Sequence, residues 1–221
     1  ISHNIFCNKK IDNKGTFEIT DSSDKLGKCF AEVINSGNLK LGNIILYKDQ
    51  AYRGNYKILE NNGTLDVQGV NLYGYIVNNE NATVNMNDGI IKAITYGIHN
   101  IGNLNVTGGT IKAESNNIAG NDYYGVYNQS GNLNVTGGVI EAKHSVYNNA
   151  GKVTIKDGTL KTSKYGIYNT NAGTVEMSGG SIKNSTYPDE EIYGIYNEKN
   201  GVVKLENGEI SLTSIKTIVK Y

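Results

Sequence analysis

The stretch GNLNVTGGTIKA at residues 102–113 returns nearly verbatim as GNLNVTGGVIEA at residues 131–142. Successive copies of this unit start 19 to 29 residues apart. A unit of this length cannot bury an apolar face alone, so the repetition indicates a fold in which neighbouring units stack on one another. Weaker copies start at Gly15, Gly37, Gly63, Ala82, Gly151, Gly173 and Gly201.

A second motif closes most units. Each unit holds three short segments in which apolar and polar residues alternate, separated by Gly or Asn. This alternation predicts strands, and no segment has the spacing of a helix. The sequence predicts an all-β fold, a right-handed parallel β-helix with three-strand rungs about 4.8 Å apart and about nine repeats. The closing motif reads YGIHN at 96–100, YGVYN at 124–128, HSVYN at 144–148, and YGIYN at 165–169 and 193–197.

We expect a single domain over residues 1–221, with an N-terminal cap region at 1–14 and repeats over 15–221. A chain of this length is sufficient for one substantial core. The 27 glycines and the abundant asparagines suit tight turns, which need positive φ or a side chain that closes on the backbone. Because the sequence begins at Ile1 rather than methionine, we expect a piece of a longer protein.

The alternation also predicts which side chains face the interior. Aliphatic residues that recur in phase should form inward columns, and the closing asparagines share their parity. Stacked asparagines can hydrogen-bond from rung to rung, which would satisfy their buried amides. The expected first-strand column is Leu65, Val84, Leu104, Leu133, Val153, Val175 and Val203. The second-strand column is Ile91, Ile111, Ile140, Leu160, Ile182 and Ile210. The third strand adds Val77, Ile98, Val126, Val146, Ile167 and Ile195, and the asparagine ladder Asn79, Asn100, Asn128, Asn148, Asn169 and Asn197.

Composition limits the partners. The 21 basic and 21 acidic residues balance, and Arg53 is the only arginine, so we expect no nucleic-acid partner. No apolar stretch is long enough to cross a membrane, so we expect no membrane insertion. Motifs of nucleotide or metal sites are absent, so we expect neither a cofactor nor a metal. Pairing of Cys7 with Cys29 stays open, as does the oligomeric state.

On these repeats the chain resembles the pectate-lyase-like β-helix superfamily. More closely, its GNLNVTGG and YGIYN motifs are similar to the adhesin-type β-helical domains of low-GC Gram-positive surface proteins. The resemblance covers nearly the whole chain from Gly15 onward. It implies a secreted or cell-surface protein without catalytic activity that binds a glycan or a host surface protein. The alternative is a polysaccharide lyase or a phage-tailspike-like depolymerase, since the fold hosts many functions.

The acidic residues do not favour the enzymatic alternative. In the outward first-strand column, Asp66 and Glu176 lie five rungs apart, about 24 Å, too far for a shared cation or an acid–base pair. Each is expected beside a lysine, Lys40 or Lys204, which relieves repulsion in the stack. The two internal histidines, at 99 and 144, stand where other repeats have tyrosine, so substitution in a ladder explains them. We therefore expect no enzyme.

Three units carry extra residues, at 48–55, 115–123 and 184–192, always between the second and third strands. Equal placement should gather these insertions on one edge of the coil, where solenoids often bind partners. Tolerated length variation at a turn is the competing explanation. The ligand-binding residues predicted on this edge are Tyr52, Arg53, Asp122, Tyr123, Tyr187, Asp189 and Glu190.

A row of outward tyrosines should flank this edge on the third strand. Aromatic rings in a row can contact sugars or a protein partner. The alternative is that the rings stack on one another and shield the sheet. A flat grid of Thr and Asn on the first strand permits ice binding as a minor hypothesis. The predicted flanking residues are Tyr127, Tyr147 and Tyr168.

Overall fold

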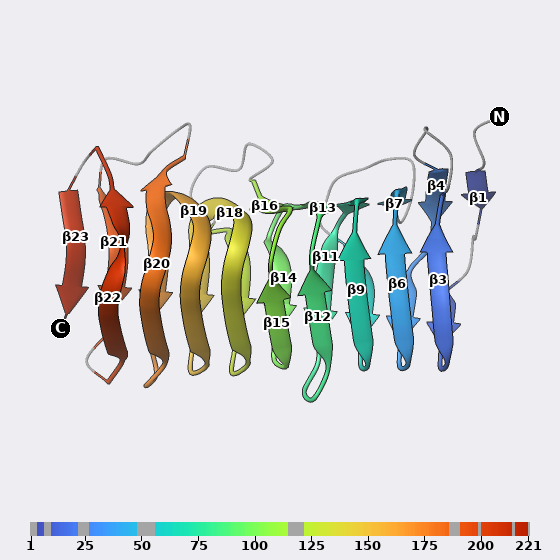
Figure 1. The fold of residues 1–221 in the computed structure, drawn as a ribbon, viewed down its shortest axis with the longest axis horizontal. Coiled ribbons are helices and arrows are strands. Elements are labelled where there is room, and N and C mark those ends of the chain that lie inside the picture. Colours follow the sequence, from blue (N-terminus) through green and yellow to red (C-terminus); the bar gives the residue numbers. More distant parts are fainter. Residues whose placement is uncertain are drawn as a thin grey trace.

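The computed structural model describes residues 4–6, 10–21, 27–47, 56–114, 122–185, 191–198, 200–213 and 215–220. Within this part of the chain every regular element is a strand, β1 to β23, and all the strand pairs are parallel. The strands stack into an elongated body with the N-terminus at one end and the C-terminus at the other (Figure 1).

The strands form three series, and each strand pairs with its counterpart in the next rung. The first sheet contains β3 (Thr16–Thr20), β6 (Asn38–Gly42), β9 (Thr64–Gln68), β12 (Thr83–Met86), β15 (Asn103–Val106) and the N-terminal parts of β18 (Asn132–Asn148), β19 (Lys152–Asn169), β20 (Thr174–Asn184) and β22 (Val202–Ser211). The second sheet contains β1 (Asn4–Phe6), β4 (Gly27–Phe30), β7 (Ile44–Tyr47), β10 (Val70–Tyr73), β13 (Gly89–Ala93), β16 (Thr110–Ala113) and later parts of β18, β19, β20 and β22.

The third sheet contains β2 (Ile11–Asn13), β5 (Val33–Asn35), β8 (Lys57–Asn61), β11 (Tyr75–Asn78), β14 (Tyr96–Asn100), β17 (Tyr124–Asn128), the ends of β18 and β19, β21 (Ile192–Asn197) and β23 (Ile215–Lys220). The chain is therefore a parallel β-helix, and the predicted fold class is confirmed. A right-handed coil is expected, because parallel crossovers are right-handed in about 98% of cases.

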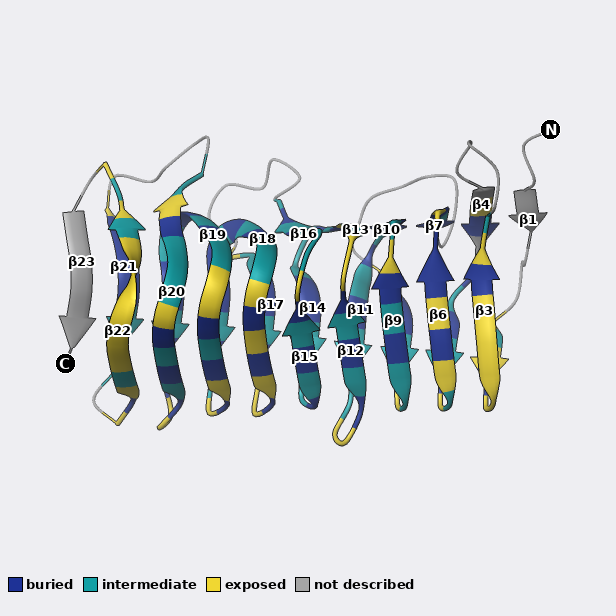
Figure 2. Ribbon diagram, in the orientation of Figure 1, coloured by how far each residue is buried: buried dark blue, intermediate teal, exposed yellow. Residues whose placement is uncertain are grey.

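The core lies between the three sheets. Leu104, Ile111 and Val126 represent its three aliphatic columns, and all three are fully buried. Along the strands, buried and exposed bands alternate (Figure 2). At the C-terminal end, Val203 and Ile210 are only partly buried, because no described first-sheet or second-sheet strand covers β22. The predicted inward columns of the first and second strands are confirmed.

One unit of the third sheet differs from the prediction by one residue. Val77 and Asn79 were expected inside, but Ile76 and Asn78 are fully buried there. Ile76 is in register with Ile98, and Asn78 with Asn100. The unit ends in YIVNN and lacks the Gly–aliphatic–aromatic–Asn order of the closing motif, so its two consecutive asparagines left the parity ambiguous.

Buried asparagines form a continuous ladder at the turn after the third sheet. In each rung, Nδ2 donates to Oδ1 of the next asparagine at 2.7 to 2.9 Å. Nδ2 also donates to a nearby backbone carbonyl, as from Asn128 to Gly131 at 2.9 Å. The buried amides are thereby satisfied. The ladder runs through Asn13, Asn35, Asn61, Asn78, Asn100, Asn128, Asn148, Asn169 and Asn197.

The glycine of the closing motif makes room for the next rung. A Cβ atom at Gly125 would lie 2.4 Å from Cγ2 of Ile140 on the second sheet. The unit that reads HSVYN has Ser145 in this place, and the residue following Ile140 in its column is Leu160. Leucine has no methyl group on Cβ, so a serine fits. The sequence difference between units thus follows from packing against the neighbouring strand.

Candidate functional site

The three insertions occur in equivalent connections. They leave the second sheet after β7, β16 and β20 and enter the third sheet at β8, β17 and β21. Their flanking strand ends share the upper edge of the coil in Figure 1, which we call the insertion edge. The common placement that the sequence predicted is confirmed. The predicted binding residues Tyr52, Arg53, Tyr187, Asp189 and Glu190 lie outside the described residues.

A small cavity of about 130 Å³ opens at the insertion edge, and we call it the edge cavity. It joins the ends of β16 and β20, the middle of β18 and the residue before β17. Tyr123 is half-buried and makes no aromatic contact within the described part of the chain, and it lines this cavity. The lining residues are Lys112, Ala113, Glu114, Tyr123, Glu141, Ala142 and Ser185.

Alternating charges form one wall of the edge cavity. Lys112 Nζ lies 3.3 Å from a carboxylate oxygen of Glu114 and 3.3 Å from one of Glu141. Lys92 Nζ lies 2.6 Å from the other Glu114 oxygen. Partial burial opposes the charge on Glu114, but hydrogen bonds from Lys92 and Lys112 outweigh it and lower the pKa of this carboxyl group. The wall thus offers charged donors and acceptors at neutral pH.

Asp122 lies beside the edge cavity and contacts the corner of β18. Its Oδ1 is 2.9 Å from Lys143 Nζ and 3.1 Å from His144 Nε2. The His144 contact is within ion-pair distance but forms no hydrogen bond. Burial lowers the pKa of His144 to about 4, against the opposing effect of Asp122, so the ring is neutral at pH 7. Asp122, predicted to bind ligand, is therefore already engaged in holding the segment before Tyr123.

Two columns of aromatic rings cover the outer face of the third sheet next to this edge. In the first, Tyr147 stacks on Tyr127 at 5.2 Å and on Tyr168 at 5.1 Å, with interplanar angles of 10° and 6°. The central aromatic column is His99, Tyr127, Tyr147, Tyr168 and Tyr196. The edge aromatic column is Tyr96, Tyr124, His144, Tyr165 and Tyr193. His99 and His144 therefore both stand in tyrosine columns, as the sequence indicated.

The stacking decides how these tyrosines can bind. The rings of Tyr127, Tyr147 and Tyr168 lie against the neighbouring rings of the column, so a sugar cannot stack on them face to face. Ring edges and hydroxyl groups remain at the surface. Burial raises the pKa of Tyr124 to about 12, and burial with a 2.7 Å hydrogen bond to Glu198 raises the pKa of Tyr168. The phenols are therefore neutral hydrogen-bond donors at physiological pH.

The outer face of the first sheet carries the predicted polar column. Glu176 Oε2 lies 2.7 Å from Lys152, and Oε1 lies 3.5 Å from Lys204. Asp66 is in register with Lys40 but accepts a 2.7 Å hydrogen bond from Asn85. A shallow groove of about 450 Å³, the first-sheet groove, is lined by Asn103, Asn132, Asn134, Thr136, Lys152, Thr154, Lys156 and Glu176. Among the described residues, no three His, Cys, Asp or Glu side chains gather as a metal site requires.

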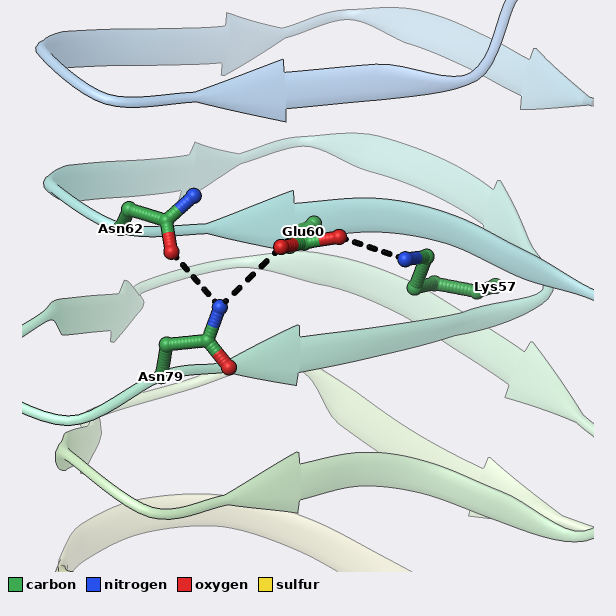
Figure 3. Close-up of polar contacts among 4 residues, drawn as sticks. All are labelled: Lys57, Glu60, Asn62 and Asn79. Atoms are coloured by element: carbon green, nitrogen blue, oxygen red, sulfur yellow. Dashed lines mark hydrogen bonds and ion pairs between the residues drawn. The ribbon is translucent and has the colours of Figure 1, made fainter.

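A polar cluster runs along β8 to the turn that follows β8 and β11 (Figure 3). Glu60 accepts from Lys57 Nζ at 2.5 Å and from Asn79 Nδ2 at 3.3 Å. Asn79 Nδ2 also donates to Asn62 Oδ1 at 2.6 Å. The hydrogen bond raises the pKa of Lys57 and lowers that of Glu60. Glu60 is in register with Val77 and hence with His99, so Glu60 occupies the line of the central aromatic column.

Comparisons of the chain with protein-family models, with curated proteins and with solved structures found no match. In the described part of the chain, no helix has the length and hydrophobicity needed to span a membrane. The functional assignment therefore depends on the geometry of the surface, and above all on the edge cavity beside Tyr123.

Proposed function

We propose that this chain is a non-catalytic ligand-binding β-helix of the pectate-lyase-like, adhesin type. It acts as a secreted or bacterial cell-surface protein and recognises a glycan or a host protein at the insertion edge. The observation that carries this proposal is the edge cavity, where the ring of Tyr123 meets the charged wall of Lys112, Glu114 and Glu141. A partly exposed aromatic ring that lines a cavity next to directed polar groups is typical of sugar-binding and protein-binding sites.

The size of the edge cavity limits what enters it. At about 130 Å³ it is smaller than the several hundred Å³ typical of sites for whole drug-sized ligands. It suits one sugar ring or one side chain, held against Tyr123 and hydrogen-bonded by Glu114, Glu141 or Ser185. The ligand is therefore expected to insert a terminal or branching group here, with the rest lying along the insertion edge.

A glycan array with the isolated chain, followed by titration of the strongest ligand, tests the proposal. Tyr123→Ala should weaken that ligand by about tenfold or more, as expected for an aromatic anchor in a small site. Tyr73→Ala is the matched control, because this tyrosine lies on β10, stacks on Tyr47 and is not among the residues that line the edge cavity, being two rungs before Lys112. Equal affinity of wild type and Tyr123→Ala would place the site elsewhere. If the array selects no glycan, the same variants are compared on immobilised host surface proteins.

The enzymatic alternative has its own assay. A polysaccharide lyase would generate unsaturated uronide absorbance from acidic polysaccharides, and a depolymerase would generate new reducing ends. We expect neither, with or without calcium, because Asp66 and Glu176 are held in separate polar contacts at different heights of the first sheet. Reproducible product formation would replace the adhesin proposal.

A further inference from the structure

The central aromatic column is a regular array of polar ring edges. Successive ring centroids from Tyr127 to Tyr196 lie 5.2, 5.1 and 4.8 Å apart, close to the strand spacing. The column spans five consecutive rungs from His99 to Tyr196. A ligand that follows the coil axis therefore meets the same aromatic edge once in every rung.

The middle of this column has hydroxyl groups that the protein does not use. Among the described residues, the hydroxyl groups of Tyr127 and Tyr147 have no hydrogen-bond partner, whereas that of Tyr168 donates to Glu198 at 2.7 Å. Their ring faces are covered by stacking, so they can contact a ligand only through edges and hydroxyl groups. The edge aromatic column beside them packs edge-to-face, as between Tyr124 and Tyr127 at 66°, and holds these rings in place.

We propose that the outer face of the third sheet from β14 to β21 binds an extended, β-1,4-linked glycan that lies along the coil axis. One pyranose unit of such a chain is about as long as one strand spacing, so one sugar falls on each rung. Neighbouring β-1,4-linked sugars present opposite edges to the column, and both edges carry hydroxyl groups. The equatorial hydroxyl groups of the sugars exchange hydrogen bonds with the phenols of Tyr127 and Tyr147. This site is separate from the edge cavity and does not depend on the function proposed there.

The same spacing argues against an extended peptide. A β-strand advances about 3.3 Å per residue, so side chains on one face recur at about 6.7 Å and lose register with the column within two rungs. The site also ends at β14. In the preceding rungs the same line is occupied by Glu60 and Val77, which break the aromatic repeat.

Calorimetric titration of the intact chain with cello-oligosaccharides of two to six units tests the proposal. Because each added sugar covers one more of the five rungs, affinity should rise with length up to five units and then level off, with the largest gain where the chain reaches both Tyr127 and Tyr147. Malto-oligosaccharides are the matched control, since their α-1,4 linkages curve the chain away from a straight column. Equal affinity for maltohexaose and cellohexaose, or no rise with length, would overturn the proposal.

The double variant Tyr127→Phe, Tyr147→Phe separates hydrogen bonding from folding, because it keeps both rings and their stacking. Loss of two hydroxyl groups should weaken cellohexaose by about fivefold to thirtyfold. Tyr123→Ala should bind cellohexaose as wild type does, which distinguishes this site from the edge cavity. Unchanged cellohexaose affinity in the double Phe variant would overturn the proposal, whatever Tyr123→Ala does to the array ligand.

Discussion

The two halves of the third sheet have the same interior and different exteriors. Inside, the asparagine ladder passes from Asn35 to Asn128 and beyond with one hydrogen-bond pattern. Outside, one line of residues changes from Glu60 and Val77 in the N-terminal half to a tyrosine stack in the C-terminal half. Inward columns are constrained by the rung above and below, whereas outward columns can change without loss of the fold. The coil is thus a scaffold whose outer faces can specialise.

The largest effect is expected in the ladder, equally in both halves. Asn128→Ala removes a donor to Asn148 and an acceptor for Asn100, which leaves buried polar atoms unpaired. We expect a loss of about 4 kcal/mol in the free energy of unfolding, measured by denaturant titration.

Asn35→Ala should cost about the same, because its contacts are equivalent. The outward Asn105→Ala is the control and should cost under about 1 kcal/mol. A large difference between the Asn35 and Asn128 variants would mean that the two halves do not share one interior.

Truncation of the aliphatic core comes next. Ile111 is fully buried, and Ile111→Ala should destabilise the chain by about 3 kcal/mol through lost burial and a cavity. Thr107→Ala, at an exposed position directly after β15, should cost under about 0.5 kcal/mol in the same titration. Similar losses at both positions would contradict the assignment of inward and outward faces.

In the C-terminal half of the third sheet, His144 should make the free energy of unfolding depend on pH. His144 is buried and its pKa falls to about 4, below the value near 6.5 of an unfolded histidine. The unfolded chain therefore binds the extra proton first, and stability is lost as pH falls through this window. Between about pH 7 and pH 5 the loss from this residue is about 2 kcal/mol.

His144→Tyr restores the residue that its column has elsewhere and removes the titration. Its stability should change less with pH than that of wild type over this window, measured by thermal or denaturant unfolding. Identical pH profiles would show that His144 titrates normally in the folded chain.

The smallest expected difference in stability is between two outward residues of the third sheet, Tyr147 and Val77. Tyr147 stacks on two neighbours, so Tyr147→Ala should cost about 1.5 kcal/mol. Val77→Ala, in the same line of the N-terminal half, should cost about 0.5 kcal/mol. Equal costs in urea titrations would mean that the tyrosine stack adds nothing beyond ordinary burial.

The interior could be predicted from the sequence because stacking requires the same residue type at the same place in every rung. The prediction was wrong only where one unit departs from the motif, and Ile76 and Asn78 lie inside in place of Val77 and Asn79. The insertion edge was also predictable, since it follows from equal placement in the repeat. The contacts of Asp122 were not, because residues outside the repeat have no parity that assigns their partners.

The stacking of Tyr127, Tyr147 and Tyr168 was one of two alternatives that the sequence left open. Alternation gives the direction of a side chain but not the orientation of its ring, so ring contacts or free ring faces were equally consistent with it. The structure selects stacking, and with it the distinction between these tyrosines and Tyr123. That distinction leads to separate hypotheses for the central aromatic column and the edge cavity.

Recognition at the insertion edge is tested most directly by amide hydrogen exchange of the intact chain, with and without the ligand selected on the glycan array. Binding at the edge cavity predicts slower exchange at residues 112–114, 122–124 and 141–143, with no change in the strands of the first sheet. Protection confined to residues 132–136 and 152–156, in the first-sheet groove, would contradict it and move the site to the outer face of the first sheet.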